Sequence, residues 1–151
     1  KIYPSSEEAF NAVKELYSDC CMPFYESMID SVLLNDFDSK QFYDLKFNLI
    51  HQKILYSSLY DDRELQKFIY ERWTKYGLDL LIESGKEESV ILDYLSQYAD
   101  SEAVQVNYVD YYVRKGDYQK ALDILDEHTG QAYEVKRQEV IEAMNYHKEV
   151  S

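Results

Sequence analysis

The scarcity of residues that interrupt regular backbone most constrains what this chain can fold into. Its 151 residues include only 4 Gly and 2 Pro. A β-sandwich or barrel needs turn residues about every 8–12 positions, and this sequence does not supply them. We therefore expect an all-α fold in which long helices are joined by short turns.

Hydrophobic periodicity and capping residues divide the chain into eight expected helices. The expected starts are Ser5-Ser6, Pro23, Asp38-Ser39, Asp61-Asp62, residue 86, Ser101, residue 117 and residue 131. Gly77 is a candidate break within the fourth helix, and Gly85 is its expected end. Alternating β-branched residues over 104–113 are compatible with a strand, but the cap at Ser101 and the flanking helices favour a helix.

Apolar rows indicate which helices pack on more than one neighbour. The helix expected over about 39–59 has two rows, one of Phe42, Leu45, Leu49 and Tyr56 and one of Tyr43, Phe47, Ile50 and Ile54. Since a surface helix normally has one stripe, two rows predict a central helix with partners on two sides. The next helix places Leu65, Phe68, Ile69 and Trp73 on one face.

A repeated unit indicates how the helices are arranged. The stretch ending at Gly85 aligns with the stretch ending at Gly116, an offset of 31 residues (116 − 85). In each case the repeating unit is a helix, a turn at the glycine and a second helix. Such helix pairs stack on neighbouring pairs to bury their apolar faces. We therefore expect residues 1–151 to be one α-solenoid segment of stacked antiparallel helix pairs. Because the chain begins with Lys1, we expect it to be a fragment of a larger protein.

Residues 111–122 also half-match a tetratricopeptide unit. Ala121 is the small residue that lets two helices approach, and Tyr118 is the aromatic beside it. Val109 stands where the motif has another small residue, and the proline expected at the end of the unit is absent. The pattern favours a generic α-solenoid over a tetratricopeptide array.

Charge and apolar run lengths argue against several partners. With 16 Lys and Arg against 29 Asp and Glu, the net charge is −13 at pH 7. Nucleic acid and anionic lipid both require clustered cations, so we expect neither to bind directly. No apolar run approaches the roughly 20 residues that cross a bilayer. The adjacent Cys20 and Cys21 are expected to be inert thiols in a reducing compartment, rather than a redox or metal site completed by His51 or His128.

The residues that carry chemistry form no recognisable catalytic pattern. Four isolated glycines do not make a phosphate loop, and His51 is a lone histidine on a helix. Carboxylate pairs such as Asp61-Asp62, Glu87-Glu88 and Asp126-Glu127 fall at expected helix ends or on polar faces, where caps and solvated charges are found. We therefore expect a protein that is not an enzyme and has no catalytic, cofactor-binding or metal site.

The 16 tyrosines are the unusual part of the composition. Most occupy apolar helix phases and are expected to pack in the core with their hydroxyl groups at its edge: Tyr43, Tyr56, Tyr94, Tyr98, Tyr108, Tyr112 and Tyr118. The residues expected to matter most for packing are Trp73, Tyr94, Tyr112, Tyr118, Ala121 and Leu125. Tyr is also common at interface hot spots, and the candidates for partner binding are Tyr76, Tyr111 and Tyr146.

From residue 42 onwards, the order of features resembles the C-terminal α-helical region of the large scaffold nucleoporins. The resemblance lies in residues 43–50, in Asp61-Asp62 with 68–73 and 77–81, in 91–95, and in 111–125 followed by 135–143. These pieces cover about the last two-thirds of the chain and most resemble the inner-ring 155/170-kilodalton type. The outer-ring 133-kilodalton type, vesicle-tethering solenoid subunits and a tetratricopeptide-like peptide-binding adaptor remain alternatives.

The resemblance implies a structural function. A member of this family would be a scaffold component of the nuclear pore complex, in the nucleus at the nuclear envelope, and would act in nucleocytoplasmic transport, including that of mRNA. Its partners would be other nucleoporins, bound through a helical surface without catalysis or cofactors. It would contact neither nucleic acid directly nor the membrane by insertion, and its association with the nuclear envelope would run through those partners.

Overall fold

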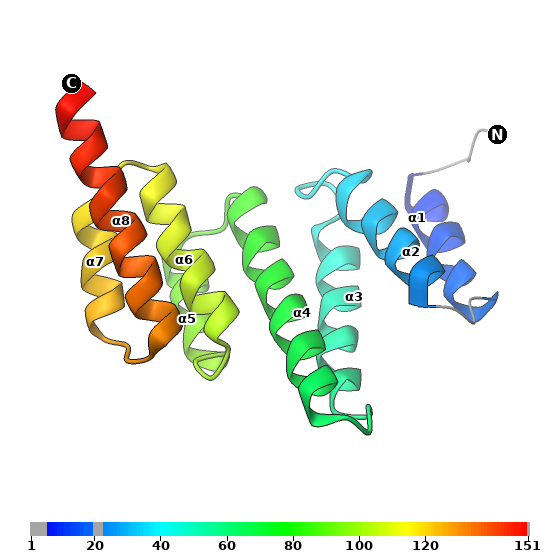
Figure 1. The fold of residues 1–151 in the computed structure, drawn as a ribbon. Helices are drawn as coiled ribbons and strands as arrows, with labels where there is room; N and C mark the ends of the chain where they lie inside the picture. The colour runs from blue at the N-terminus through cyan, green and yellow to red at the C-terminus, as the bar shows by residue number, and fades with distance from the viewer. Residues whose placement is uncertain (1–5, 20–22, 151) are drawn as a thin grey trace.

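The computed structural model describes residues 6–19 and 23–150, which form a row of helices with the N- and C-terminal ends at its opposite ends (Figure 1). The helices are α1 (Ser6–Glu15), η1 (Leu16–Asp19), α2 (Pro23–Asn35), α3 (Tyr43–Ser57), α4 (Arg63–Glu83), α5 (Glu88–Gln97), α6 (Glu102–Arg114), α7 (Tyr118–Asp126) and α8 (Gln131–Val150). The described ranges contain no β-strand, so the all-α prediction is confirmed. Expectations for Lys1, Ser5, Cys20 and Cys21 concern residues outside those ranges.

Several helices begin at the caps that the sequence indicates. The Asp62 carboxylate accepts hydrogen bonds from the backbone N–H groups of Glu64 and Leu65, at 2.8 and 3.0 Å. The Ser101 hydroxyl accepts one from Val104 at 3.4 Å and opens α6. Since a side-chain acceptor satisfies an otherwise unpaired N–H group, these residues fix where α4 and α6 start. The Val-rich segment after Ser101 is therefore helical, as expected.

The turns at Gly85 and Gly116 have the same backbone structure. Their φ angles are +74° and +79°. The N–H groups of Lys86 and Asp117, the next residue in each turn, donate to carbonyls five positions earlier at 3.0 and 2.9 Å. Both glycines thus end a helix in a left-handed conformation that favours Gly. The offset of 31 residues seen in the sequence corresponds to a recurring turn.

Gly77 does not divide α4, contrary to the expected break. It lies inside a continuous helix, and a Cβ atom there would lie 2.7 Å from the Cζ atom of Tyr94. The Tyr94 hydroxyl donates to the Thr74 carbonyl at 2.7 Å. A residue without a side chain is therefore needed at position 77, because Tyr94 of α5 packs against that point of α4. Helix propensity, which depends on local sequence, does not predict this requirement.

Packing runs mainly between helices that are neighbours along the row. α3 and α4 lie side by side as an antiparallel pair, α4 also contacts α6, and α6, α7 and α8 follow one another (Figure 1). The short α5 packs on α4. The helix α6 is covered along most of its length, with only its end residues Glu102 and Arg114 exposed, whereas the other helices have exposed residues along their length.

Two clusters of buried side chains meet at α3. The smaller joins α1, α2 and α3 and contains Phe10, Ile29, Leu33, Phe42 and Leu49. The larger extends from α3 to α8 and includes Ile50 and Ile54 of α3. The prediction that α3 is a central helix is thus confirmed for these residues: its two rows enter different clusters, although Tyr56, at the end of one row, is exposed.

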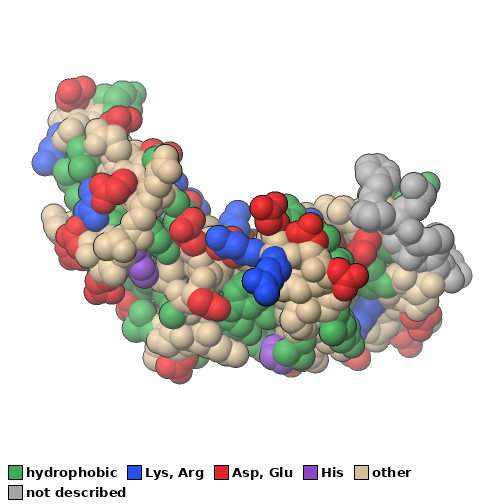
Figure 2. Space-filling view, turned by 60° about the horizontal axis from the view of Figure 1, so that its bottom comes forward, with side chains coloured by type: hydrophobic (Ala, Val, Ile, Leu, Met, Phe, Trp, Pro, Cys, Tyr) green, Lys and Arg blue, Asp and Glu red, His purple; other side chains and the backbone are tan. Residues whose placement is uncertain are grey.

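Charge is unevenly distributed on the surface. Acidic side chains lie along the whole of the face seen in Figure 2, whereas Lys and Arg side chains are fewer and gather mainly near its middle. This pattern agrees with the net charge of −13 and makes the few cationic regions distinctive.

Candidate partner-binding cleft

A cleft of about 750 Å³ lies between the N-terminal helices and the α3–α4 pair. Lys14, Tyr17 and Asp30 line it from the α1, η1 and α2 side. Side chains of α3, of α4 and of the turn between them form the other wall: Leu49, Gln52, Lys53, Tyr56, Tyr60, Leu65, Phe68, Ile69, Arg72 and Trp73. Its size falls within the range of ligand sites in proteins, about 300–1,000 Å³.

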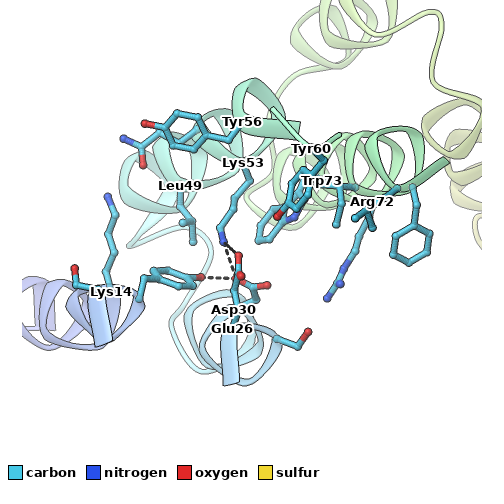
Figure 3. A pocket seen from close by; sticks show the side chains of 16 residues that line it. Lys14, Glu26, Asp30, Leu49, Lys53, Tyr56, Tyr60, Arg72 and Trp73 are labelled. Atoms are coloured by element: carbon cyan, nitrogen blue, oxygen red, sulfur yellow. Dashed lines mark hydrogen bonds and ion pairs between the residues drawn. The ribbon is translucent and has the colours of Figure 1, made fainter. Parts of the chain in front are cut away.

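A polar cluster around Lys53 crosses the cleft (Figure 3). The Lys53 ammonium group lies 2.6 Å from a Glu26 carboxylate oxygen and 3.5 Å from an Asp30 oxygen, and so joins α3 to α2. The Tyr17 hydroxyl donates to the same Asp30 carboxylate. Lys53 also lies 4.2 Å from the centre of the Tyr17 ring and 5.4 Å from that of the Trp73 ring, within cation–π range. The cluster holds the two walls together.

Asp30 is the buried acid of this cluster. Burial raises its pKa above the ordinary value, because the charged form loses solvation. The Tyr17 hydrogen bond and the charges of Lys53 and Arg72 oppose this rise, whereas Glu26 adds to it. The Asp30 carboxyl group thus has a structural role, because its contacts with Tyr17 and Lys53 join α2 to η1 and to α3.

The outer part of the cleft is apolar and exposed. Tyr56 of α3 is 58% exposed and Phe68 of α4 is 60% exposed, with Leu65 one turn before Phe68 also exposed. The expectation that Tyr56 packs in the core is therefore wrong. Leu65, Phe68, Ile69 and Trp73 do share a face, but only Trp73 is buried. Periodicity identifies the shared face of a helix without revealing whether a neighbouring element covers it.

Two cations lie at opposite ends of the cleft (Figure 3). Lys14 comes from α1 and Arg72 from α4. In the part of the chain that the structure describes, neither forms an ion pair, and the Arg72 Nε–H donates to the Tyr76 hydroxyl at 3.0 Å. The cleft therefore presents positive charge in a strongly acidic protein.

The residues expected to be important for packing lie in the larger core cluster. Trp73, Tyr94, Tyr112, Ala121 and Leu125 are buried there, and Tyr118 is half-buried against it. The Tyr112 hydroxyl donates to Glu88 at 2.8 Å. Burial and the hydrogen bonds with Tyr108 and Glu88 raise the pKa of Tyr112 far above its ordinary value, so that it stays protonated.

The three tyrosines predicted to bind partners are not brought together. Tyr76 lies on α4, half-buried, with its ring edge-on to Trp73 at 5.2 Å between centres. Tyr111 lies on α6, half-buried and stacked on Tyr108 at 6.1 Å. Tyr146 lies on α8 and is 67% exposed. They belong to three different surfaces of the row.

The described residues contain neither a candidate metal cluster nor a helix that could cross a membrane. Within 6–19 and 23–150, no group of three or more His, Cys, Asp or Glu side chains could hold a metal ion. Nor is any helix of those ranges long and apolar enough to span a bilayer. His51 stacks on Phe47 at 6.5 Å and His128 on Tyr133 at 4.7 Å.

Sequence reasoning missed the cleft as a site. Lys14 and Tyr60 carried no signal, because their role depends on helices that are distant in sequence. One signal was present in the sequence. The segment of α4 has an apolar stripe over Leu65, Phe68 and Ile69 next to a second apolar helix, and an apolar stripe that no neighbouring helix covers indicates a binding surface.

Comparisons with protein-family models, with curated proteins and with solved structures found no match to this chain.

Proposed function

We propose that this chain is a non-catalytic scaffold segment that docks other proteins, with its helix pairs stacked as an α-solenoid. The observation that carries the proposal is the row of helices with a turn that recurs at Gly85 and Gly116. A row in which helices contact mainly their neighbours leaves long flanks free for partners, which is how solenoid proteins bind. The exposed aromatic wall of the cleft offers one such surface.

We further propose the nuclear pore complex as the assembly. The sequence resemblance to the scaffold nucleoporins supports it, together with the all-helical fold; the resemblance lies in residues 43–50, 61–62, 68–73, 77–81, 91–95, 111–125 and 135–143. On this proposal the partners are other nucleoporins, and the chain reaches the nuclear envelope through them. Docking requires no cofactor and no reaction.

Binding to purified scaffold nucleoporins tests this function. The tagged 151-residue chain is immobilised, and each inner-ring and outer-ring scaffold nucleoporin is passed over it at physiological salt. We expect specific, saturable binding of at least one of them. A folded chain, judged by circular dichroism, that binds none of them would refute the nuclear pore assignment.

A tetratricopeptide-like peptide adaptor is the second candidate function. The observation that favours it is the complete burial of Ala121 in a cluster shared by the packed α6 and α7, as the small position of that motif requires. A peptide array probed with the chain and with Tyr111→Ala tests it. Binding of array peptides that depends on Tyr111 would favour the adaptor; binding unchanged by the substitution would argue against it.

A further inference from the structure

One wall of the cleft is a short apolar stripe of α4 that is followed by a cation. Leu65, Phe68 and Ile69 follow one another at helical spacing along α4, and Arg72 completes the series at i+7. Seven residues of helix span about 10 Å, or two turns. The stretch from Leu65 to Arg72, three apolar residues followed by a cation, therefore matches the length over which an amphipathic helix presents side chains at i, i+3 or i+4, and i+7.

Residues of α3 and of the turn after it extend the apolar wall of the cleft. Tyr56 and Tyr60 widen the apolar wall from the α3 side, and Trp73 is 2% exposed at its base. Lys53 separates this apolar part from the acids Glu26 and Asp30, which it already pairs. The carboxylates in the cleft are thus engaged, while the aromatic surface is exposed. Aromatic side chains of this kind are typical anchors of interfaces.

Charge indicates the chemistry of the occupant. The cleft contains three cations, Lys14, Lys53 and Arg72, against two acids, and the two cations at its ends are free of ion pairs within the described residues. The chain as a whole carries −13. A basic ligand would be attracted to most of the surface, but an acidic one is favoured only near such a local excess of positive charge.

We infer that the cleft binds an amphipathic helix of a partner protein, with apolar residues at i, i+3 or i+4, and i+7 and carboxylates near both ends of the apolar stripe. The apolar residues pack on Phe68, Leu65 and Tyr56, and the carboxylates pair with Lys14 and Arg72. The described residues offer no exposed strand edge for an extended peptide, whereas both walls of the cleft are helical. This inference rests on the proposed docking function and names the partner class at this surface.

The single tryptophan makes the inference testable in solution. Trp73 is the only Trp of the chain and lines the cleft, so its fluorescence can report on a ligand bound there. The probe is a synthetic peptide of about 16 residues without Trp or Tyr, in which Leu residues follow the i, i+3, i+4, i+7 spacing, with Glu at both ends and Ala elsewhere. One control peptide has Lys in place of Glu, and another has the same composition in shuffled order.

Matched variants of the chain separate the cleft from the rest of the surface. Phe68→Ala removes an exposed aromatic of the cleft, and Leu92→Ala removes a 48% exposed side chain of α5 outside it. Lys14→Glu changes a charge in the cleft, and Lys67→Glu makes the same change at an exposed residue of α4 that does not line it. All four positions are at least partly exposed, so the variants are expected to fold.

We expect saturable binding of the acidic peptide, seen as a change in Trp73 emission. Phe68→Ala should weaken binding at least about tenfold and Leu92→Ala should leave it unchanged. Lys14→Glu should weaken it about two- to fivefold, more than Lys67→Glu does. Equal binding of the shuffled peptide, tighter binding of the basic peptide, or no effect of Phe68→Ala would overturn the inference.

Two further outcomes are distinguishable. If sedimentation shows that the chain self-associates and Phe68→Ala disperses it, the occupant is a second copy and the inference is wrong. If a scaffold nucleoporin binds the chain and neither Phe68→Ala nor Lys14→Glu weakens that binding, the inference fails while the proposed function stands. Peptide binding that depends on Phe68, with no nucleoporin bound, supports the inference and removes the nuclear pore assignment instead.

Discussion

Lys46 is a buried cation that holds two segments together. Its ammonium group donates to the Leu34 carbonyl at 2.7 Å, to the Phe37 carbonyl, and to the Ser39 hydroxyl at 3.2 Å. Leu34 lies in the last turn of α2, where unpaired carbonyls favour a cation. Burial lowers the pKa of Lys46 below its ordinary value. The side chain therefore links α3 to the end of α2 through hydrogen bonds rather than through an ion pair.

Replacing Lys46 should destabilise the protein. Lys46→Met keeps an apolar stem but removes the hydrogen bonds to the partly buried Leu34 and Phe37 carbonyls, so we expect a loss of about 2 kcal/mol in the free energy of unfolding, measured in urea. Lys67→Met, at an exposed position of α4, is the matched control and should change it by less than about 0.5 kcal/mol. Equal effects of the two substitutions would contradict the role of Lys46.

Asp30 should make stability depend on pH. Burial raises its folded pKa above the value of 3.8 expected in the unfolded chain. Between these two values the folded state binds more protons, so stability falls as pH rises through that window. The contribution of Asp30 is thus most favourable below pH 3.8 and least favourable above the raised pKa.

Asp30→Asn removes this titration. We expect the unfolding free energy of the wild type, relative to that of the variant, to decrease as pH rises upward from 3.8. Titration of the ¹³C-labelled side-chain carboxyl group by NMR measures the pKa directly. A midpoint at or below 3.8 would show that Lys53 and the Tyr17 hydrogen bond outweigh burial.

At the scale of elements, α4 is continuous because Gly77 admits Tyr94. In isolation Ala favours a helix over Gly by about 1 kcal/mol. In this structure a Cβ atom at Gly77 collides with the ring and hydroxyl of a buried tyrosine. We therefore expect Gly77→Ala to destabilise the protein by about 1–3 kcal/mol in urea unfolding. Combination with Tyr94→Ala, which removes the ring, should abolish that penalty, and a simple sum of the two losses would argue against the contact.

The recurring turn gives a paired prediction. Gly85 and Gly116 have nearly the same positive φ, and neither faces a neighbour closer than 3.9 Å at the Cβ position. Backbone strain alone should then decide the effect of Ala. We expect Gly85→Ala and Gly116→Ala each to cost about 1–2 kcal/mol, with similar values, and the Asn variants to cost less. Thermal or urea unfolding checks this; clearly unequal losses would show that the two turns differ energetically.

At the scale of the whole molecule, the buried side chains form two core clusters. Phe10 anchors the N-terminal cluster, with its ring 5.1 Å from that of Phe37 and 6.0 Å from that of Phe42. The larger cluster starts on the other side of α3. In a row of helices, stability resides largely in local units and in the interfaces between neighbours.

Phe10→Ala should therefore act locally. We expect a loss of about 3–5 kcal/mol in the N-terminal cluster, seen by hydrogen exchange as faster exchange in α1 and α2. Exchange in α6, α7 and α8 should be unchanged. Val140→Ala, in α8, is the reciprocal control and should affect the other end. Uniformly faster exchange along the chain in either variant would indicate a single cooperative core.

Much of the secondary structure follows from the sequence alone. Asp62 and Ser101 cap their helices, and Gly85 and Gly116 end theirs, because capping and left-handed turns depend on a few adjacent residues. The buried positions of Trp73, Ala121 and Leu125 follow from periodicity combined with apolar character. The sequence by itself thus determined the all-helical fold, several helix ends and much of the core, although α3 begins at Tyr43 and not at the expected cap Asp38-Ser39.

Only the tertiary structure decided which apolar faces are covered. Periodicity places Phe68 and Trp73 on one face and both line the cleft, yet Phe68 is 60% exposed and Trp73 is 2% exposed. The continuity of α4 at Gly77 likewise depends on Tyr94, which lies in another helix. The cleft combines Lys14 of α1 with Arg72 of α4, and contacts between helices distant in sequence leave no local pattern.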